Sequence, residues 1–214
     1  MANLGCVEVE YFDFGYGRGD LIRQMCAAGK VQFKDTFISQ ADWPAVKGDT
    51  AKYPTGGLPV ATINGCKMGE TCAIVRFLAI STGWYPTDPM CAWAADTNLD
   101  MWTDCINSMG AVLFAPEEKK EECMAKFLCC VETFCKVASE RMEHCKWKHT
   151  AGDKPSVGDV AIYTLWANLG ANEICPFKEP VCAIFAKYPC LNETLDCMKK
   201  CNASYVDTRE KKPM

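Results

Sequence analysis

The stretch GGLPVATINGCKMGETCAIVRFL, residues 56–78, predicts the second half of a small sheet and the helix that covers it. A short apolar run, residues 59–63, breaks at Asn64-Gly65 and resumes over residues 66–68. Asn-Gly between two such runs is a strong signal for a two-residue β-hairpin. A helical pattern follows over residues 71–81, so this part of the chain reads as strand, strand, helix.

The residues before this stretch predict a strand, a helix and a second strand. VEVEY, residues 7–11, alternates with period two, which puts Val7, Val9 and Tyr11 on one face of a strand. Residues 21–28 have a helical pattern that ends at Gly29, and residues 31–38 read as the second strand. The order βαβ followed by ββα is that of a thioredoxin-like domain, which we place at residues 1–81.

Beyond residue 81 the pattern changes. Prolines and a glycine in residues 82–89 predict a linker. The chain that follows is helical in period, and we place an all-α domain at residues 90–205, with a charged C-terminal tail at 206–214 that is expected to fray. Ser156 and Asp159 have the spacing of a capping box at a helix start. The candidate helices cover residues 90–115, 116–145, 156–170, 180–187 and 191–203.

Composition excludes several classes of protein. Apolar residues make up 49% of the chain, so a packed globular body is expected. The formal net charge of −4 gives no reason to expect a surface that binds nucleic acid. No apolar run approaches the ~20 residues of a membrane helix, and no secretory signal is visible at the N-terminus. We therefore expect a cytoplasmic protein with no membrane partner.

The 16 cysteines do not predict a disulfide framework. Such frameworks belong to short secreted chains, whereas these cysteines are spread through helical patterns where Cys acts as a small apolar residue. Cys197 and Cys201 lie one helical turn apart, but two thiols make an incomplete metal site. We expect free, mostly buried thiols and no metal.

The sequence resembles the cytosolic glutathione transferases, and its finer pattern resembles their sigma class, which includes glutathione-dependent prostaglandin D synthases and S-crystallins. The resemblance implies the glutathione transferase fold, a thioredoxin-like half followed by an all-helical half, and glutathione as co-substrate. It extends over nearly the whole chain. The motifs that carry it are EYF (10–12), GRGDLIR (17–23), QADWPAVK (40–47), GGLPV (56–60), NGCKMGETCAIVRFLA (64–79), FAPEEKKE (114–121) and SVGDVAIY (156–163).

The resemblance implies roles for two pairs of residues within the stretch 56–78, Leu58-Pro59 and Glu70-Thr71. The Leu58-Pro59 bond would be cis, and the Leu58 backbone would pair with the cysteinyl backbone of glutathione. Glu70 and Thr71 would bind the γ-glutamyl group at a helix N-terminus, where N–H groups favour an anion. Sigma members usually carry Gln-Ser here, and a glutamate at position 70 is able to serve only the ammonium group of glutathione.

Three further residues acquire roles only through the resemblance. Trp43 and Lys47 would bind the glycyl carboxylate of glutathione through an indole N–H and an ammonium group. Asp100 would reach glutathione bound to the partner subunit. That last role implies a homodimer.

Tyr11 is the residue that the resemblance assigns to catalysis. Its hydroxyl would donate a hydrogen bond to the glutathione thiolate, which lowers the pKa of the thiol. Arg18 would add positive potential beside the sulfur. Between Tyr11 and Leu21 this chain has one residue more than the family pattern, which leaves Tyr16 as an alternative donor to the preferred Tyr11.

The function that follows is transfer of the glutathione thiolate to small hydrophobic electrophiles, typical of detoxification. The alternatives are a glutathione-dependent prostaglandin isomerase and a catalytically weak, crystallin-like or ligand-binding relative. A thiol–disulfide reductase is disfavoured, because that chemistry requires a cysteine at the start of the first helix and residues 14–20 contain none.

Overall fold

The computed structural model of the chain describes residues 4–13 and 16–209 and divides into two compact units. The first unit runs to Tyr85 and also takes in the chain from Cys201 onward. The second unit is Pro86–Lys200. In the described part of the chain, no helix combines the length and the apolar character needed to cross a membrane.

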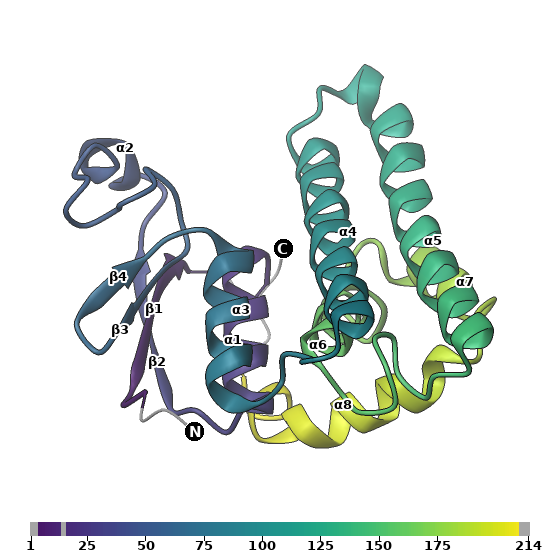
Figure 1. Cartoon of the computed structure of the whole chain (residues 1–214). Helices are drawn as coiled ribbons and strands as arrows, with labels where there is room; N and C mark the ends of the chain where they lie inside the picture. The colour runs from purple at the N-terminus through teal and green to yellow at the C-terminus, as the bar shows by residue number, and fades with distance from the viewer. Residues whose placement is uncertain (1–3, 14–15, 210–214) are drawn as a thin grey trace. The chain divides into compact units, whose positions relative to one another are not determined.

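The first unit contains a four-stranded sheet in the order β2-β1-β3-β4 (Figure 1). β1 (Val7–Phe12) pairs parallel with β2 (Phe33–Ile38) and antiparallel with β3 (Val60–Ile63), which pairs antiparallel with β4 (Cys66–Met68). Asn64 and Gly65 join β3 to β4 with φ angles of 50° and 78°. Positive φ at both positions is what the predicted two-residue turn requires.

Two helices, α1 (Arg18–Ala28) and α3 (Thr71–Thr82), lie side by side against one face of this sheet (Figure 1). Every second residue of β1, namely Val7, Val9 and Tyr11, is buried, as the alternation predicted. The βαβ-ββα order of the thioredoxin-like half is therefore confirmed. The sequence predicts no regular element between β2 and residue 59, whereas the structure has the short helix α2 (Trp43–Val46) there; one helical turn is too short to show a period.

The second unit is helical, which confirms the predicted all-α half. Its longest helices, α4 and α5, pack against each other. The helices are α4 (Pro89–Leu113), the 3₁₀ turn η1 (Glu117–Lys119), α5 (Lys120–Cys145), α6 (Val157–Leu165), the π-helical turn η2 (Trp166–Gly170), α7 (Lys178–Phe185) and α8 (Leu191–Val206), whose last turns belong to the first unit.

Helix α6 is the centre of the second unit, since every one of its residues is buried. The predicted capping box at its start is confirmed: the Oδ2 atom of Asp159 accepts the backbone N–H of Ser156 at 2.7 Å and its hydroxyl at 3.0 Å. The Oδ1 atom of the same carboxylate accepts the backbone N–H and the hydroxyl of Thr150 at 2.9 and 2.8 Å. Four hydrogen bonds thus satisfy a fully buried charge.

The C-terminal tail differs from its prediction. Residues 206–209, expected to fray because they are charged, are held by hydrogen bonds as far as Arg209. The physical reason is a buried carboxylate on α1, Asp20, to which Arg209 donates. Residues 210–214, the rest of the predicted tail, lie outside the described residues.

Candidate glutathione site

The strand register brings three of the predicted site segments to one edge of the sheet. Glu10 is paired with Val60, so continuing the β1–β3 ladder by one pair places Tyr11 opposite Pro59. Ala61 is paired with Met68, and continuing that ladder by two pairs places Pro59 opposite Glu70. Neighbouring strands are separated by about 4.8 Å, so Tyr11, Pro59 and Glu70 lie within a few such spacings.

Tyr11 lies at the carboxyl end of β1 with its side chain 7% exposed. The backbone N–H of Arg18 donates to the phenolic oxygen of Tyr11 at 3.3 Å. The chain approaches the ring closely: a Cβ at Gly17 would lie 3.0 Å from the Tyr11 oxygen, and one at Gly19 would lie 2.8 Å from ring carbons. Gly17 also has φ of +77°, so both glycines are required for this turn to reach the tyrosine.

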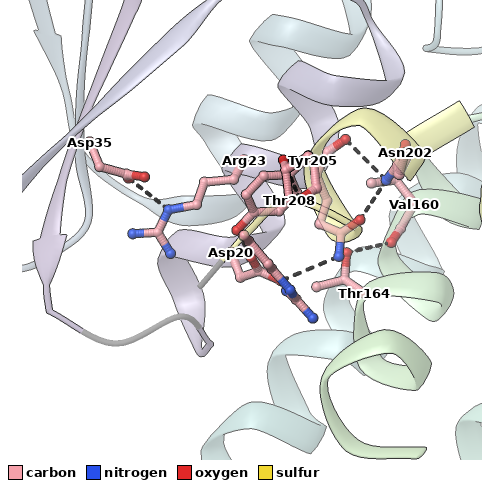
Figure 2. Close-up of polar contacts among 10 residues, drawn as sticks. Asp20, Arg23, Asp35, Val160, Thr164, Asn202, Tyr205 and Thr208 are labelled. Atoms are coloured by element: carbon pink, nitrogen blue, oxygen red, sulfur yellow. Dashed lines mark hydrogen bonds and ion pairs between the residues drawn. The ribbon is translucent and has the colours of Figure 1, made fainter. Parts of the chain in front are cut away.

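Burial keeps the Tyr11 phenol protonated. Burial raises the pKa of Tyr11 above its ordinary value, while the N–H of Arg18 and the positive charges of Arg18 and Arg23 oppose that rise. Arg23 is itself buried and forms a 2.7 Å ion pair with Asp35 on β2 (Figure 2). At neutral pH Tyr11 is therefore a hydrogen-bond donor in a positive potential, which suits a neighbouring anion.

Tyr16, the alternative donor, has a different environment. Its side chain is 4% exposed, and the guanidinium of Arg209 lies 5.4 Å from the centre of its ring. Two of the residues that separate Tyr16 from Tyr11, at positions 14 and 15, lie outside the described residues. The residue added to the family pattern therefore falls in a segment that includes them.

The two residue pairs of the opening stretch have the predicted local geometry. The Leu58-Pro59 peptide bond is cis, and Pro59 is buried while Leu58 is half-buried. Glu70 is exposed and precedes α3 with φ 66° and ψ 104°, and its side chain does not cap the helix. A positive φ at a residue other than glycine is strained, and such strain is typical of functional positions. Thr71 follows as the first residue of α3 and is 5% exposed.

Trp43 begins α2 and rests on a group of residues that the sequence reading did not identify. Its indole stands edge-on to the ring of Tyr53 at 4.8 Å and to the ring of Phe12 at 6.1 Å. Tyr53 is fully buried, and its hydroxyl donates to Glu10 at 3.0 Å. Lys52 forms a 3.2 Å ion pair with the same carboxylate. We call Glu10, Lys52 and Tyr53 the Trp43 support.

Of the remaining predicted residues, Lys47 and Asp100 are exposed and Arg18 is half-buried. Lys47 closes α2, with its backbone N–H bonded to the carbonyl of Trp43 at 3.0 Å. Arg18, half-buried, begins α1. Asp100 lies on α4 in the second unit, and its side chain faces outward. The first unit thus gathers Tyr11, Arg18, Pro59 and Glu70, while Asp100 belongs to the other unit.

The expectation that most of the cysteine thiols are buried was wrong. Those on short elements and helix surfaces keep part of their side chain in solvent, because only one face of such an element is covered. Among the described residues, no group of three or more metal-ligating side chains gathers closely enough to hold an ion. The buried cysteines are Cys26, Cys105, Cys135 and Cys175, and the exposed ones are Cys6, Cys66, Cys129 and Cys145.

Comparison with known proteins identifies relatives. No protein-family model matches the chain. It is 31% identical over 110 residues to glutathione S-transferase 2 of Caenorhabditis elegans, a match that covers 49% of this chain and 57% of the relative. It is 29% identical over 115 residues to human hematopoietic prostaglandin D synthase, covering 54% and 53%. The matched region thus spans little more than half the length of these relatives.

Solved structures match over the whole chain. A C. elegans glutathione transferase superposes with a TM-score of 0.79 at 23% identity, covering 99% of this chain and 100% of that one. The thioredoxin-like half and the helical half are therefore those of the glutathione transferase fold. The structural neighbours thus show the fold, and the sequence relatives, which are similar to part of the chain, include proteins named glutathione S-transferase.

Proposed function

We propose that the protein is a glutathione transferase that adds the glutathione thiolate to small hydrophobic electrophiles. The observation that carries the proposal is the position of Tyr11. It is a buried, protonated phenol at the carboxyl edge of the sheet, bonded to the N–H of Arg18 and adjoining the cis-proline corner. Open α/β sheets bind their ligands at this edge.

The chemistry requires a lower pKa at the sulfur of glutathione. A thiol with a pKa near ~8.5 is only about 3% thiolate at pH 7. The Tyr11 hydroxyl donates a hydrogen bond to the thiolate and Arg18 adds positive potential, so both favour the charged form. A fall of about 2 pKa units makes the thiolate the major species and raises its fraction up to about thirtyfold. The rest of the rate comes from holding the electrophile beside the sulfur.

The other site residues would bind the glutathione tripeptide itself. The Leu58 backbone beside Pro59 pairs with the cysteinyl group in the manner of an added strand. Glu70 faces the ammonium of the γ-glutamyl group, and Thr71 at the N-terminus of α3 receives its carboxylate. Trp43 and Lys47 bind the glycyl carboxylate, and no metal takes part.

We also propose a cellular location, an oligomeric state and a class for the enzyme. We infer a cytoplasmic homodimer, in which Asp100 of each subunit reaches the glutathione bound by the other. We also assign the protein to the sigma class and to detoxification. Its match to human prostaglandin D synthase, a relative of comparable identity to the nematode transferase, supports that class.

The same match favours a second candidate activity. A glutathione-dependent prostaglandin isomerase uses the same thiolate, so the two activities share Tyr11 and Arg18. Conversion of a prostaglandin endoperoxide with glutathione, compared with conjugation of a chlorodinitrobenzene, separates them. A ratio strongly in favour of the endoperoxide would make isomerisation the main activity.

The proposal is tested by binding to glutathione-agarose followed by a chlorodinitrobenzene assay. Elution by free glutathione together with turnover is the expected result. Elution without turnover would instead support a crystallin-like or ligand-binding relative. Failure to bind would contradict both enzyme readings.

A further inference from the structure

Helix α8 and the residues after it carry three side chains that lie on α1. Asn202 and Tyr205 are spaced by three residues, which puts them on one face of α8. Arg209 follows in the turn after the helix, where its N–H bonds to the carbonyl of Tyr205 at 2.9 Å. The side-chain amide of Asn202 donates to the carbonyl of Gln24 at 3.3 Å. We call Asn202, Tyr205 and Arg209 the C-terminal clamp.

The clamp closes on Asp20, a carboxylate in the first turn of α1 that is fully buried. The hydroxyl of Tyr205 donates to its Oδ1 atom (Figure 2). A guanidinium nitrogen of Arg209 lies 2.8 Å from its Oδ2 atom. Burial and the neighbouring Asp20 raise the pKa of Tyr205, so this phenol stays protonated and keeps donating. A buried carboxylate is tolerated only with such partners.

Arg209 also contacts Tyr16, which lies two residues before the start of α1. Its guanidinium lies 5.4 Å from the ring centre of Tyr16 and 5.6 Å from that of Tyr205, within the range of cation–π contact. The clamp therefore holds Tyr16 and Asp20, which flank Gly17 and Arg18. Within this turn the N–H of Asp20 bonds to the carbonyl of Gly17 at 3.2 Å.

The turn formed by residues 16–20 also supplies the hydrogen-bond donor to Tyr11. The N–H of Arg18 donates to the Tyr11 oxygen at 3.3 Å, already near the long limit for such a bond. A displacement of the turn by a few tenths of an ångström removes this donor and moves the Arg18 charge. Arg209 forms an ion pair with Asp20 from outside α1, while Arg23, on α1 itself and paired with Asp35, adds positive charge near Asp20 and Tyr205.

We propose that the C-terminal clamp positions the Tyr16–Asp20 turn so that Arg18 stays against Tyr11, which makes Asp20, Tyr205 and Arg209 positioning residues for thiolate formation. This inference rests on the proposed function. The clamp thereby adjusts the pH at which the enzyme works by acting through the Tyr16–Asp20 turn. An anchor that only adds stability would leave that pH unchanged.

The test compares Arg209→Gln and Tyr205→Phe with Asp207→Asn, a control that removes an exposed charge from the same segment. The readout is the pH profile of kcat/KM for conjugation, with each variant assayed well below its melting temperature. We expect both clamp variants to shift the profile upward by about 0.5–1 pH unit, so activity falls about three- to tenfold on the acid side and recovers at alkaline pH. Arg209→Lys, which keeps the charge, should recover part of the shift, and Asp207→Asn should match the wild type.

Unshifted profiles in both clamp variants would overturn the proposal, whatever their melting temperatures. A second measurement is independent of glutathione: hydrogen exchange of the Arg18 amide in the unliganded protein. We expect faster exchange in Arg209→Gln than in Asp207→Asn, and equal exchange would overturn the proposal. A wild-type protein that fails to bind glutathione contradicts the proposed function instead, and the amide exchange still decides whether the clamp orders the turn.

Discussion

At the scale of single residues, the site depends on how close the backbone comes to one phenol. Tyr11 was assigned by resemblance, and the strand pattern placed it on the buried face of β1. The contacts of Gly17 and Gly19 with its ring were not predictable, because a glycine in a sequence does not reveal which side chain it approaches. Tyr16 is covered by Arg209, which favours Tyr11 as the donor to the thiolate.

Gly19→Ala tests this close approach. The new methyl group would lie 2.8 Å from ring carbons of Tyr11 and 3.1 Å from its Cβ, so the ring or α1 must move. We expect a loss of about 1–3 kcal/mol in the free energy of unfolding and a large fall in kcat. Denaturant unfolding and a conjugation assay measure both quantities.

Gly110→Ala is the matched control. Gly110 lies within α4, and a Cβ there meets no atom within 4 Å. Alanine in a helix interior is favoured over glycine by about 0.5–1 kcal/mol, so this variant should be slightly more stable and fully active. If Gly19→Ala behaves like Gly110→Ala, the account of the turn is wrong.

At the scale of elements, the long regular features were predictable and the short irregular ones were not. The Asn64-Gly65 hairpin and the Ser156–Asp159 capping box have local signals, and both were confirmed. Helix α2 is a single turn, and its orientation depends on Tyr53 and Glu10, which are 43 residues apart in sequence. A pairing over that separation leaves no periodic trace, so the Trp43 support was missed.

Tyr53→Phe tests the Trp43 support. The change removes the hydrogen bond to Glu10 but keeps the ring on which the Trp43 indole stands. We expect about 1 kcal/mol lower stability and a KM for glutathione raised a few-fold, since α2 is held less firmly while the chemical step is untouched. Steady-state kinetics with varied glutathione provide the measurement.

Tyr188→Phe, a hydroxyl deletion in the second unit, serves as the control. It should leave the KM for glutathione unchanged. A KM for Tyr53→Phe equal to that of the control would mean that α2 does not depend on this hydrogen bond.

At the scale of the whole molecule, the two-part architecture was predictable from the spacing of apolar residues. That spacing mixes strand and helix patterns in the first half and is helical throughout the second. The burial of the thiols and the attachment of residues 206–209 to α1 were not predictable. Arg209 and Asp20 are 189 residues apart, and a charged tail read locally predicts fraying. Likewise, which of the 16 cysteines is buried depends on tertiary packing that residue type alone does not fix.

The buried thiols predict that the protein loses stability in alkali. Burial raises the pKa of Cys26 to about 12, and it also raises the pKa of Cys105 and Cys135. Unfolded thiols ionise near ~8.5, so above that pH the unfolded chain binds fewer protons than the folded one. Stability is fully present below that pH and falls as pH rises toward the folded pKa values, by up to about 1.4 kcal/mol per pH unit for each thiol.

Urea unfolding between pH 7.5 and 10 measures this effect on the midpoint. We expect the midpoint to fall steadily above about pH 8.5. Cys26→Ala should give a shallower fall than the wild type, because one of the responsible thiols is gone. A midpoint that stays constant over this range would show that ionisation of the buried thiols does not govern alkaline stability.

The most direct test of the central claim is a pH titration of the thiolate absorbance of glutathione bound to the protein. For the wild type we predict a thiol pKa about 2 units below that of free glutathione. Tyr11→Phe should return the pKa most of the way to the free value, while Tyr16→Phe should leave it where the wild type has it. A bound thiol that titrates identically in the wild type and in Tyr11→Phe would contradict the account.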